Sequence, residues 1–306
     1  MIGRQVVDLL CDMGAKVTSV SLDGLRLNPK ADYALVDLTD FNLCKAITTD
    51  IDYVFHIAGI KGNIEVTKTM PASFFVPVMM MNTNMLEACR INKIKRIVYT
   101  STIGAYAPAE IFTEEHNFDG VPMDMFPGWA KRMGELQIKA YGIQYGLDNF
   151  AIVRLGSVYG PGDNFNPNNA MVIPSLIHRI KKDEGPLVVW GTGNEKRDFT
   201  YSKDIAYGII QALIEGTDSE PVNLGSGKSY SIKEVVETLN SFIDFNYEFD
   251  NKKPSGYPRR VVDISLAQKL FNYNPTTTLS DGLRQTWDWY NKHPNEYQEL
   301  KNYFHE

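Results

Sequence analysis

The chain has 306 residues, 43% of them hydrophobic, and a formal net charge of -6 at pH 7. This apolar content is ample for a large core, and the length suggests two cores or one domain with an appended lobe. The acidic balance argues against nucleic acid or an anionic membrane as a partner, because both attract Lys and Arg. No apolar run approaches the roughly 20 residues of a membrane span, and the N-terminal pattern is not that of a signal peptide.

The three cysteines, Cys11, Cys44 and Cys89, lie far apart and form no CxxC pair. No His or Asp clusters near them at metal-ligand spacing. We therefore expect buried, reduced thiols in a cytoplasmic protein, and no structural or catalytic metal.

The first half of the chain alternates helix and strand patterns. An amphipathic helix is predicted over residues 1–13, ending at Gly14. Further elements are predicted as strands at 15–22, 33–36, 53–57, 96–101 and 149–155, and as helices at 41–48, 79–91 and 128–145. Alternation at this spacing predicts βαβ units, and hence an α/β fold with a doubly wound parallel sheet.

Beyond residue 160 the pattern changes. Gly160–Asn169 is rich in Gly, Pro and Asn and is typical of a loop that leaves the sheet. Helices are predicted at 171–181, 203–215, 232–242 and from 280, with a short strand at 187–190. We divide the chain into a first domain, 1–160, which also receives part of 196–225, and a smaller mixed C-terminal lobe, 161–306. Ligands of such open sheets bind at the carboxyl ends of the strands.

The start of the chain has part of a dinucleotide-binding pattern. That pattern places three glycines between the first strand and the first helix, so that the backbone can approach the pyrophosphate. Gly3 stands where the last glycine would be, whereas the strand and the earlier glycines are missing from the sequence. Asp23, 20 residues later, stands where an acid would bind the adenosine ribose, and an acid there favours NAD over NADP. The alternative is that Asp23 is a solvated turn residue.

The missing strand has a structural consequence. It would lie in the middle of the sheet, so its loss would expose two strand edges and an apolar seam. We therefore expect either that the true start lies upstream or that the sequence is truncated. A chain of this length alone would bind NAD weakly.

Two later segments resemble the motifs of a known family. Val98–Tyr106 is a strand ending in a Ser/Thr run before a Tyr, and Gly128–Glu135 contains a Lys at the position of a Tyr-x-x-x-Lys motif. Together with the spacing of Gly3 and Asp23, they resemble the extended short-chain dehydrogenase/reductases of the NAD-dependent epimerase/dehydratase family. The resemblance implies a Rossmann-type cofactor domain and sugar-nucleotide substrates.

The resemblance also implies roles for individual residues. The implied catalytic residues are Thr102, Lys131 and Ser101. Thr102 would hydrogen-bond the reacting sugar hydroxyl, and Lys131 would bind the nicotinamide ribose and lower the pKa of a catalytic Tyr. Asp37-Leu38 resembles an adenine-contacting pair, and His56-Ile57-Ala58-Gly59 resembles the loop that lies against the cofactor. The implied cofactor contacts are Gly3, Asp23, Asp37, Leu38, Ala58, Gly59 and Lys131.

The position of the catalytic Tyr, four residues before Lys131, is occupied by Pro127. Three explanations stay open. Another group serves in its place: Tyr106, Glu110, Glu114 or a water held by Thr102. Alternatively, the enzyme works with an apolar residue there, as some relatives do, or the protein binds without catalysing.

Downstream segments favour a nucleotide-diphosphate sugar as ligand. Arg154–Asp163 resembles the family's Arg-x-x-Asn-x-Tyr-Gly-Pro segment, with Gly156 or Ser157 in place of the Asn. Arg197, in Arg-Asp-Phe, matches the Arg that clamps the diphosphate.

Several segments most resemble the GDP-L-fucose synthase-like branch of the family: Asp163–Pro167, Val172–Leu176 and Lys253–Arg260. The branch's Cys and His epimerisation pair falls on Gly104 and Met171, neither of which can move a proton, so GDP-fucose synthesis itself is not expected. The substrate contacts implied by this resemblance are Asn166, Val172, Arg179, Arg197 and Lys253. A GDP-sugar is favoured, and a UDP- or dTDP-sugar is an alternative.

The leading hypothesis is therefore an NAD-dependent sugar-nucleotide epimerase, dehydratase or dehydrogenase that acts through a 4-ketosugar, in surface polysaccharide or deoxysugar biosynthesis. The alternative is a catalytically silent protein that binds a sugar nucleotide or a dinucleotide. Residues 79–91 and 128–145 are the helices through which we expect a homodimer to form.

Overall fold

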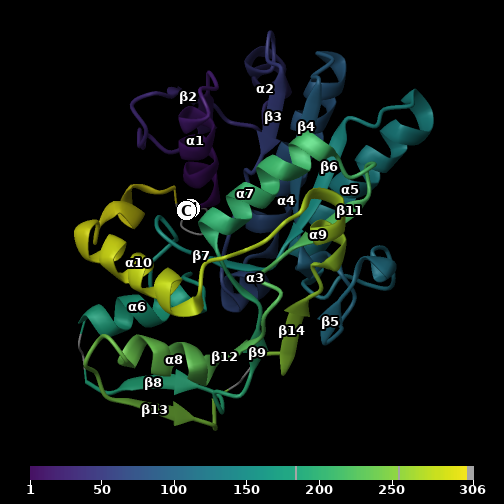
Figure 1. The fold of residues 1–306 in the computed structure, drawn as a ribbon. Coiled ribbons are helices and arrows are strands. Elements are labelled where there is room, and N and C mark those ends of the chain that lie inside the picture. The colour runs from purple at the N-terminus through teal and green to yellow at the C-terminus, as the bar shows by residue number, and fades with distance from the viewer. Residues whose placement is uncertain (183–184, 254–255, 302–306) are drawn as a thin grey trace.

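The central sheet has four parallel strands in the order β11 (Pro221–Leu224), β6 (Phe150–Leu155), β4 (Arg96–Thr102) and β3 (Tyr53–His56) (Figure 1). The computed structural model describes residues 1–182, 185–253 and 256–301. Strand β6 is buried along its whole length, as expected for a strand covered on both faces. The predicted α/β fold with a parallel sheet is confirmed.

Helices cover both faces of this sheet. Ile97 and Tyr99 of β4 join the core under α4 and α5, whereas Val98 points into the core on the opposite face, because successive strand residues alternate. The first face carries α2 (Phe41–Ile47), α4 (Pro71–Ile91) and α5 (Met125–Tyr145). The second carries α1 (Ile2–Asp12), α7 (Ser202–Glu215) and α9 (Ser265–Phe271).

A second parallel pair, β1 (Thr18–Ser21) and β2 (Asp32–Leu35), stands apart from the central sheet. Strand β1 pairs with β2 alone, and β3 pairs with β4 alone. Both strands line one cleft of about 1350 Å³, together with apolar side chains of α1, α4 and α7. The two unpaired strand edges and the apolar seam that the sequence predicted are therefore present.

The C-terminal lobe has its own core. Helices α6 (Val172–Lys182), α8 (Ile232–Asn240) and α10 (Leu279–Lys292) pack there against β8 (Leu187–Trp190), which pairs with β13 (Tyr247–Asp250). Two further sheets lie beside it: the pair β7 (Ser157–Tyr159) and β10 (Phe199–Tyr201), and the mixed sheet β12 (Tyr230–Ser231), β9 (Lys196–Arg197), β14 (Arg259–Val262) and β5 (Ile111–Phe112). Since β5 comes from the first half of the chain, the mixed sheet joins the lobe to the first half.

Strand β11, from the second half of the chain, pairs with β6 of the central sheet. The division of the chain at residue 160 stays a prediction. Short helices connect the larger elements: α3 (Ile64–Thr69) and the 3-10 turns η1 (Ile103–Ala105), η2 (Glu114–His116) and η3 (Glu296–Glu299). No helix in the described parts of the chain is long and apolar enough to cross a membrane.

Two helices begin earlier than predicted. Helix α4 starts at Pro71 instead of residue 79, with Pro71 in its first turn, and α5 starts at Met125 instead of Gly128. Pro127 therefore lies in the first turn of α5, where its missing amide hydrogen costs no intrahelical bond.

Candidate active site at the carboxyl end of β4

Thr102 is the last residue of β4 and caps the turn η1 that follows. Its hydroxyl oxygen accepts a hydrogen bond from the Gly104 amide at 3.1 Å. The side chain is half-buried and lies at the carboxyl ends of the parallel strands, where ligands of such sheets bind.

Lys131 on α5 reaches the same end of β4. Its ammonium donates to the Thr100 carbonyl at 2.9 Å and lies 5.2 Å from the centre of the Tyr99 ring. Burial lowers the pKa of Lys131 to about 8, and the carboxylate of Glu135 partly opposes that shift. A Cβ at Gly59, in the loop after β3, would lie 3.7 Å from this nitrogen. The Lys131 ammonium therefore lies between β4 and the loop that we predict to face the cofactor.

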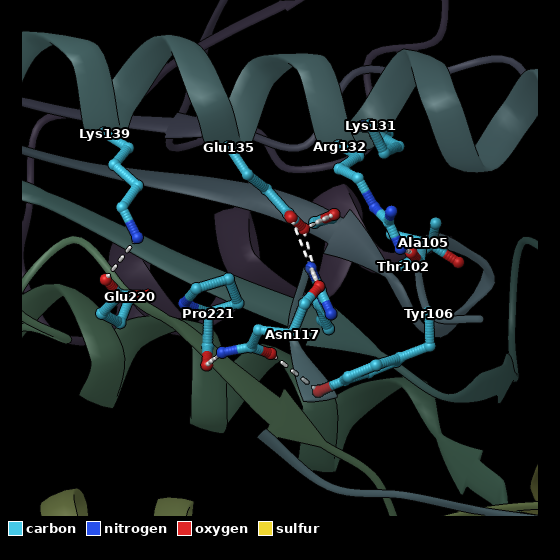
Figure 2. Close-up of polar contacts among 12 residues, drawn as sticks. Thr102, Ala105, Tyr106, Asn117, Lys131, Arg132, Glu135, Lys139, Glu220 and Pro221 are labelled. Carbon is cyan, nitrogen blue, oxygen red and sulfur yellow. Dashed lines mark hydrogen bonds and ion pairs between the residues drawn. The ribbon is translucent and has the colours of Figure 1, made fainter. Parts of the chain in front are cut away.

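The Ser101 side chain points to the face of the sheet that α5 covers, opposite to the Thr102 side chain. Its hydroxyl donates to Glu135, whose carboxylate also accepts from Arg154 Nε at 2.9 Å and from Arg154 Nη2 at 2.5 Å. The Arg154 and Glu135 side chains are fully buried. Figure 2 shows the Glu135 side chain extending from α5 toward its hydrogen-bonding partners. Ser101 therefore supports α5 on the sheet, and Thr102 stays the hydroxyl that we predict to face the ligand.

The groups suggested as substitutes for the missing Tyr lie elsewhere. Tyr106 is 1% exposed, and its hydroxyl lies 3.0 Å from Asn117 Oδ1 and 2.9 Å from Asn223 Oδ1, within hydrogen-bond distance of both. Figure 2 shows this hydroxyl turned toward Asn117 and away from Lys131. Burial raises the pKa of Tyr106 above its usual range. Glu114 accepts from the Asn223 amide at 2.8 Å, and Glu110 is exposed on a loop. Tyr106 is therefore poorly suited to proton transfer beside Thr102.

Most of the predicted cofactor residues line the cleft between β1 and β3: Gly3, Asp23, Leu38, Ala58 and Gly59. Asp23 follows β1 directly, and its carboxylate accepts from the backbone amide of Lys301 at 2.6 Å. Asp37 instead holds its own turn, because it accepts from the Thr39 amide and hydroxyl, which lower its pKa.

These residues fit a dinucleotide along the cleft. Gly3 leaves open space beside the first turn of α1, since a Cβ there would meet nothing within 4 Å. The Lys131 nitrogen would lie 3.7 Å from a Cβ at Gly59, which lines the cleft. Asp23 would hold the adenosine ribose, and Lys131 the nicotinamide ribose.

Two predicted substrate residues meet at strand β8. Arg179 donates to the Val188 carbonyl at 2.6 Å, and burial lowers its pKa. Lys253 lies 5.7 Å from the ring of Trp190, which is 57% exposed. An exposed aromatic ring beside a cation is a suitable surface for a nucleotide base.

Arg197 on β9 lies at the junction of the lobe and the first half. Its guanidinium donates to the carbonyls of Lys196 and Tyr257, each at 2.7 Å. Its pKa is lowered to about 10, first by burial and then by the charge of Arg260. Two cations near each other suit a diphosphate.

The remaining predicted substrate residues are held less directly. Asn166 accepts from the Asn168 amide within its own loop, and Val172 is exposed at the start of α6. In the predicted segment Lys253–Arg260, residues 254 and 255 lie outside the described residues.

Sequence reasoning missed one acid of this site, Asp124. It precedes α5, and its carboxylate accepts from Arg260 at 2.9 Å. Its place three residues before Pro127 was the available signal, but the partner Arg260 lies 136 residues away in sequence.

Comparisons with known proteins identify the family of the chain. The family model described as the NAD dependent epimerase/dehydratase family matches residues 1–225. Probable GDP-L-fucose synthase 1 of Oryza sativa subsp. japonica is 32% identical over 251 residues, 78% of this chain and 75% of that protein.

Two solved structures are also similar. UDP-glucuronic acid 4-epimerase from Bacillus cereus, in complex with UDP-glucuronic acid and NAD, has a TM-score of 0.81 and 25% identity, covering 95% of this chain and 96% of that one. A GDP-L-fucose synthetase from Naegleria fowleri bound to NADP has a TM-score of 0.81 and 23% identity, covering 96% and 91%. From the family model that matches residues 1–225, and from the 32% identity to the Oryza sativa relative, the chain belongs to the NAD-dependent epimerase/dehydratase family of extended short-chain dehydrogenase/reductases.

Proposed function

We propose that this protein is an NAD-dependent sugar-nucleotide epimerase, dehydratase or dehydrogenase that oxidises its sugar to a 4-keto form. The observation that carries the proposal is the convergence of Thr102, the Lys131 nitrogen and the Gly59 loop at the carboxyl end of β4, beside the cleft that Gly3 and Asp23 line.

Each residue has a task in that reaction. Thr102 would accept or donate a hydrogen bond at the reacting hydroxyl, and Lys131 would hold the nicotinamide ribose as an ammonium donor. The bound dinucleotide supplies hydride transfer. We propose NAD over NADP because the Asp23 carboxylate would repel a 2′-phosphate.

The lobe would hold the nucleotide diphosphate. Arg197 would bind the phosphates, with Arg179 and Lys253 near the base and Asn166 and Val172 along the opposite wall. A GDP-sugar is our first choice, as in the GDP-L-fucose synthase relatives, and a UDP-sugar, as in the Bacillus cereus enzyme, or a dTDP-sugar is the alternative. We place the reaction in the cytoplasm, in surface polysaccharide or deoxysugar biosynthesis.

Turnover assays test this proposal. The purified full chain is incubated with NAD and, separately, with GDP-mannose, UDP-glucose and UDP-glucuronic acid. We expect a change in sugar mass or configuration by mass spectrometry and NMR, or reduced nicotinamide absorbing at 340 nm. Thr102→Val should lower kcat about 10²–10⁴-fold if its hydroxyl takes part in proton transfer.

Pro127 supports a second candidate, a protein that binds a sugar nucleotide or a dinucleotide without turnover. Tight binding of a sugar nucleotide with no product from any of the three substrates would favour this candidate and contradict the first.

We also propose a homodimer through α4 and α5. The two helices pack on each other, and both expose apolar side chains: Val76, Met80, Met133, Leu136 and Ile143. Sedimentation equilibrium should give twice the chain mass, and Leu136→Glu should give the monomer mass.

A further inference from the structure

We propose that Asp124 is the general acid/base of this site and exchanges the proton of the reacting sugar hydroxyl in place of a tyrosine at position 127. The inference rests on the proposed function and deepens it, because it names the group that moves the proton.

The first argument is the face of α5 on which Asp124 lies. Residues three, four and seven positions apart share one face of a helix. Asp124 precedes α5, and Gly128 and Lys131 follow on the face turned toward β4 and η1. A Cβ at Gly128 would overlap the Gly104 carbonyl, and Lys131 donates to the Thr100 carbonyl. Asp124 therefore lies on the same side of α5 as Lys131, the side that contacts β4 and η1.

The second argument is the space beside Thr102. Thr102 accepts from the Gly104 amide, and the Asp124 amide donates to the Gly104 carbonyl at 3.2 Å. A Cβ built on Gly104 would overlap the Asp124 carboxylate, with the Asp124 Cβ 2.9 Å away. The absence of a side chain at Gly104 therefore gives the carboxylate its place against the turn η1, which Thr102 caps.

The third argument is that the carboxylate is available. Asp124 precedes the first turn of α5, yet its side chain makes no capping hydrogen bond. Oδ2 accepts from Arg260, whereas Oδ1 accepts no hydrogen bond from the described residues. The side chain is 39% exposed, so a substrate can reach it.

The charges around Asp124 suit an anionic sugar nucleotide. Arg260 pairs with it, and Arg197 is close enough for its own pKa to respond to both Arg260 and Asp124. A diphosphate bound by Arg197 would bring the attached sugar to the side of the site where Asp124 and Thr102 lie.

The proposed step balances as follows. The C4–H bond of the sugar breaks and its hydride passes to a nicotinamide dinucleotide, which is reduced. The O–H bond of the C4 hydroxyl also breaks, its proton passes to the Asp124 carboxylate, and its electron pair turns the carbon–oxygen single bond into a carbonyl. When the hydride returns, the Asp124 carboxylic acid gives the proton back to the oxygen.

The kinetic test uses Asp124→Asn. Asn is isosteric, keeps an oxygen for Arg260 and is well tolerated before a helix, so the fold should be retained. We expect kcat to fall about 10²–10⁴-fold, with sugar-nucleotide and NAD dissociation constants within about threefold of the original protein. Asp119→Asn is the matched control, because Asp119 is 66% exposed and pairs with His116. It should keep full activity.

A binding test does not require turnover. A carboxylate can accept a hydrogen bond from a 4-hydroxyl but not from a 4-fluoro group. The original protein should bind GDP-mannose about tenfold or more tightly than GDP-4-deoxy-4-fluoro-mannose, since a bond to a charged acceptor is lost. Asp124→Ala should bind the two equally, as followed by tryptophan fluorescence.

The outcomes separate the two proposals. If Asp124→Asn retains the kcat of an active original protein, or if Asp124→Ala still discriminates between the two ligands, Asp124 is not the proton-transfer group. If the original protein discriminates but turns over no substrate, the Asp124 contact stands and the proposed function fails. If neither ligand binds and no substrate is converted, both proposals fall.

Discussion

The two sides of strand β3 differ sharply in how they are held. Toward β4, the strand is paired along its length, from Tyr53 with Arg96 to His56 with Tyr99. Toward β1, no ladder connects the strands, and the two edges face a cleft of about 1350 Å³. The proposed catalytic residues Thr102 and Lys131 belong to the paired side, and Gly3 and Asp23 to the open side.

This contrast separates two requirements of the site. On the paired side, the Glu135–Arg154 ion pair and the packing of α5 on β4 fix Lys131 before any ligand arrives. On the open side, Gly3 and Asp23 are carried by α1 and by the end of β1, which is not bonded to the central sheet. Catalytic geometry and cofactor affinity are therefore expected to respond to different substitutions.

The largest expected effect is at the buried ion pair. Glu135→Gln leaves the fully buried Arg154 guanidinium without a counter-charge, so the free energy of unfolding should fall by about 3–5 kcal/mol. Urea denaturation followed by circular dichroism measures it. The control is Glu220→Gln in the exposed pair with Lys139, which should cost under about 1 kcal/mol. Equal losses in the two variants would contradict the contrast between the regions.

The close contact of α5 with β4 gives the next effect. A Cβ at Gly134 would lie 2.5 Å from the Tyr99 hydroxyl, which donates to the Lys131 carbonyl at 3.0 Å. Gly134→Ala should therefore destabilise the fold by about 1–3 kcal/mol and lower kcat, because α5 must move and carries Lys131 with it.

The same helix offers a control for this variant. At Gly142 a new Cβ would meet only the Leu147 carbonyl, at 3.4 Å. Gly142→Ala should therefore be neutral or stabilising, since Ala favours a helix. Thermal unfolding distinguishes the two variants, and a loss of stability at both positions would mean that the Tyr99 contact is not the cause.

The sequence predicted the parts of the fold that depend on local pattern. Short apolar runs predicted β3, β4 and β6, because a strand that is buried on both faces of a parallel sheet has few polar residues. The open seam between β1 and β3 was predicted because the dinucleotide-binding pattern at the start of the sequence has no strand before Gly3. The start of α5 was placed late because Pro127 suggests a boundary, although a first turn accommodates it.

The site was harder to predict because it depends on orientation and distant contacts. Ser101 and Thr102 are neighbours in sequence, but strand alternation sends Ser101 to Glu135 and leaves Thr102 as the hydroxyl that we predict to face the ligand. Tyr106 matched a motif position, yet η1 directs its ring into the core. Asp124 gains its role from Gly104 and Arg260, and no local pattern reports those contacts.

The pH dependence of cofactor binding probes where the two sides meet. Burial lowers the pKa of Lys131 to about 8, so its ammonium is present below that pH and is lost as the pH rises through it. If the ammonium holds the nicotinamide ribose, the dissociation constant of NAD should increase about tenfold as the pH rises from 8 to between 9 and 9.5. Isothermal titration calorimetry from pH 6.5 to 9.5 measures this. Lys131→Met should bind NAD weakly at every pH, and an unchanged slope in that variant would place the titration on another group.

The smallest expected effect on stability is on the open side, at Gly3. This glycine lies in α1 with no atom within 4 Å of a built Cβ, so Gly3→Ala should raise the free energy of unfolding by up to about 1 kcal/mol. The same methyl group would project into the space proposed for the dinucleotide, and NAD affinity should fall while the position of Lys131 is undisturbed. Thermal unfolding and NAD titration on one variant therefore test whether stability and cofactor binding are separable here. If the variant gains stability and keeps its NAD affinity, the dinucleotide does not bind beside the first turn of α1.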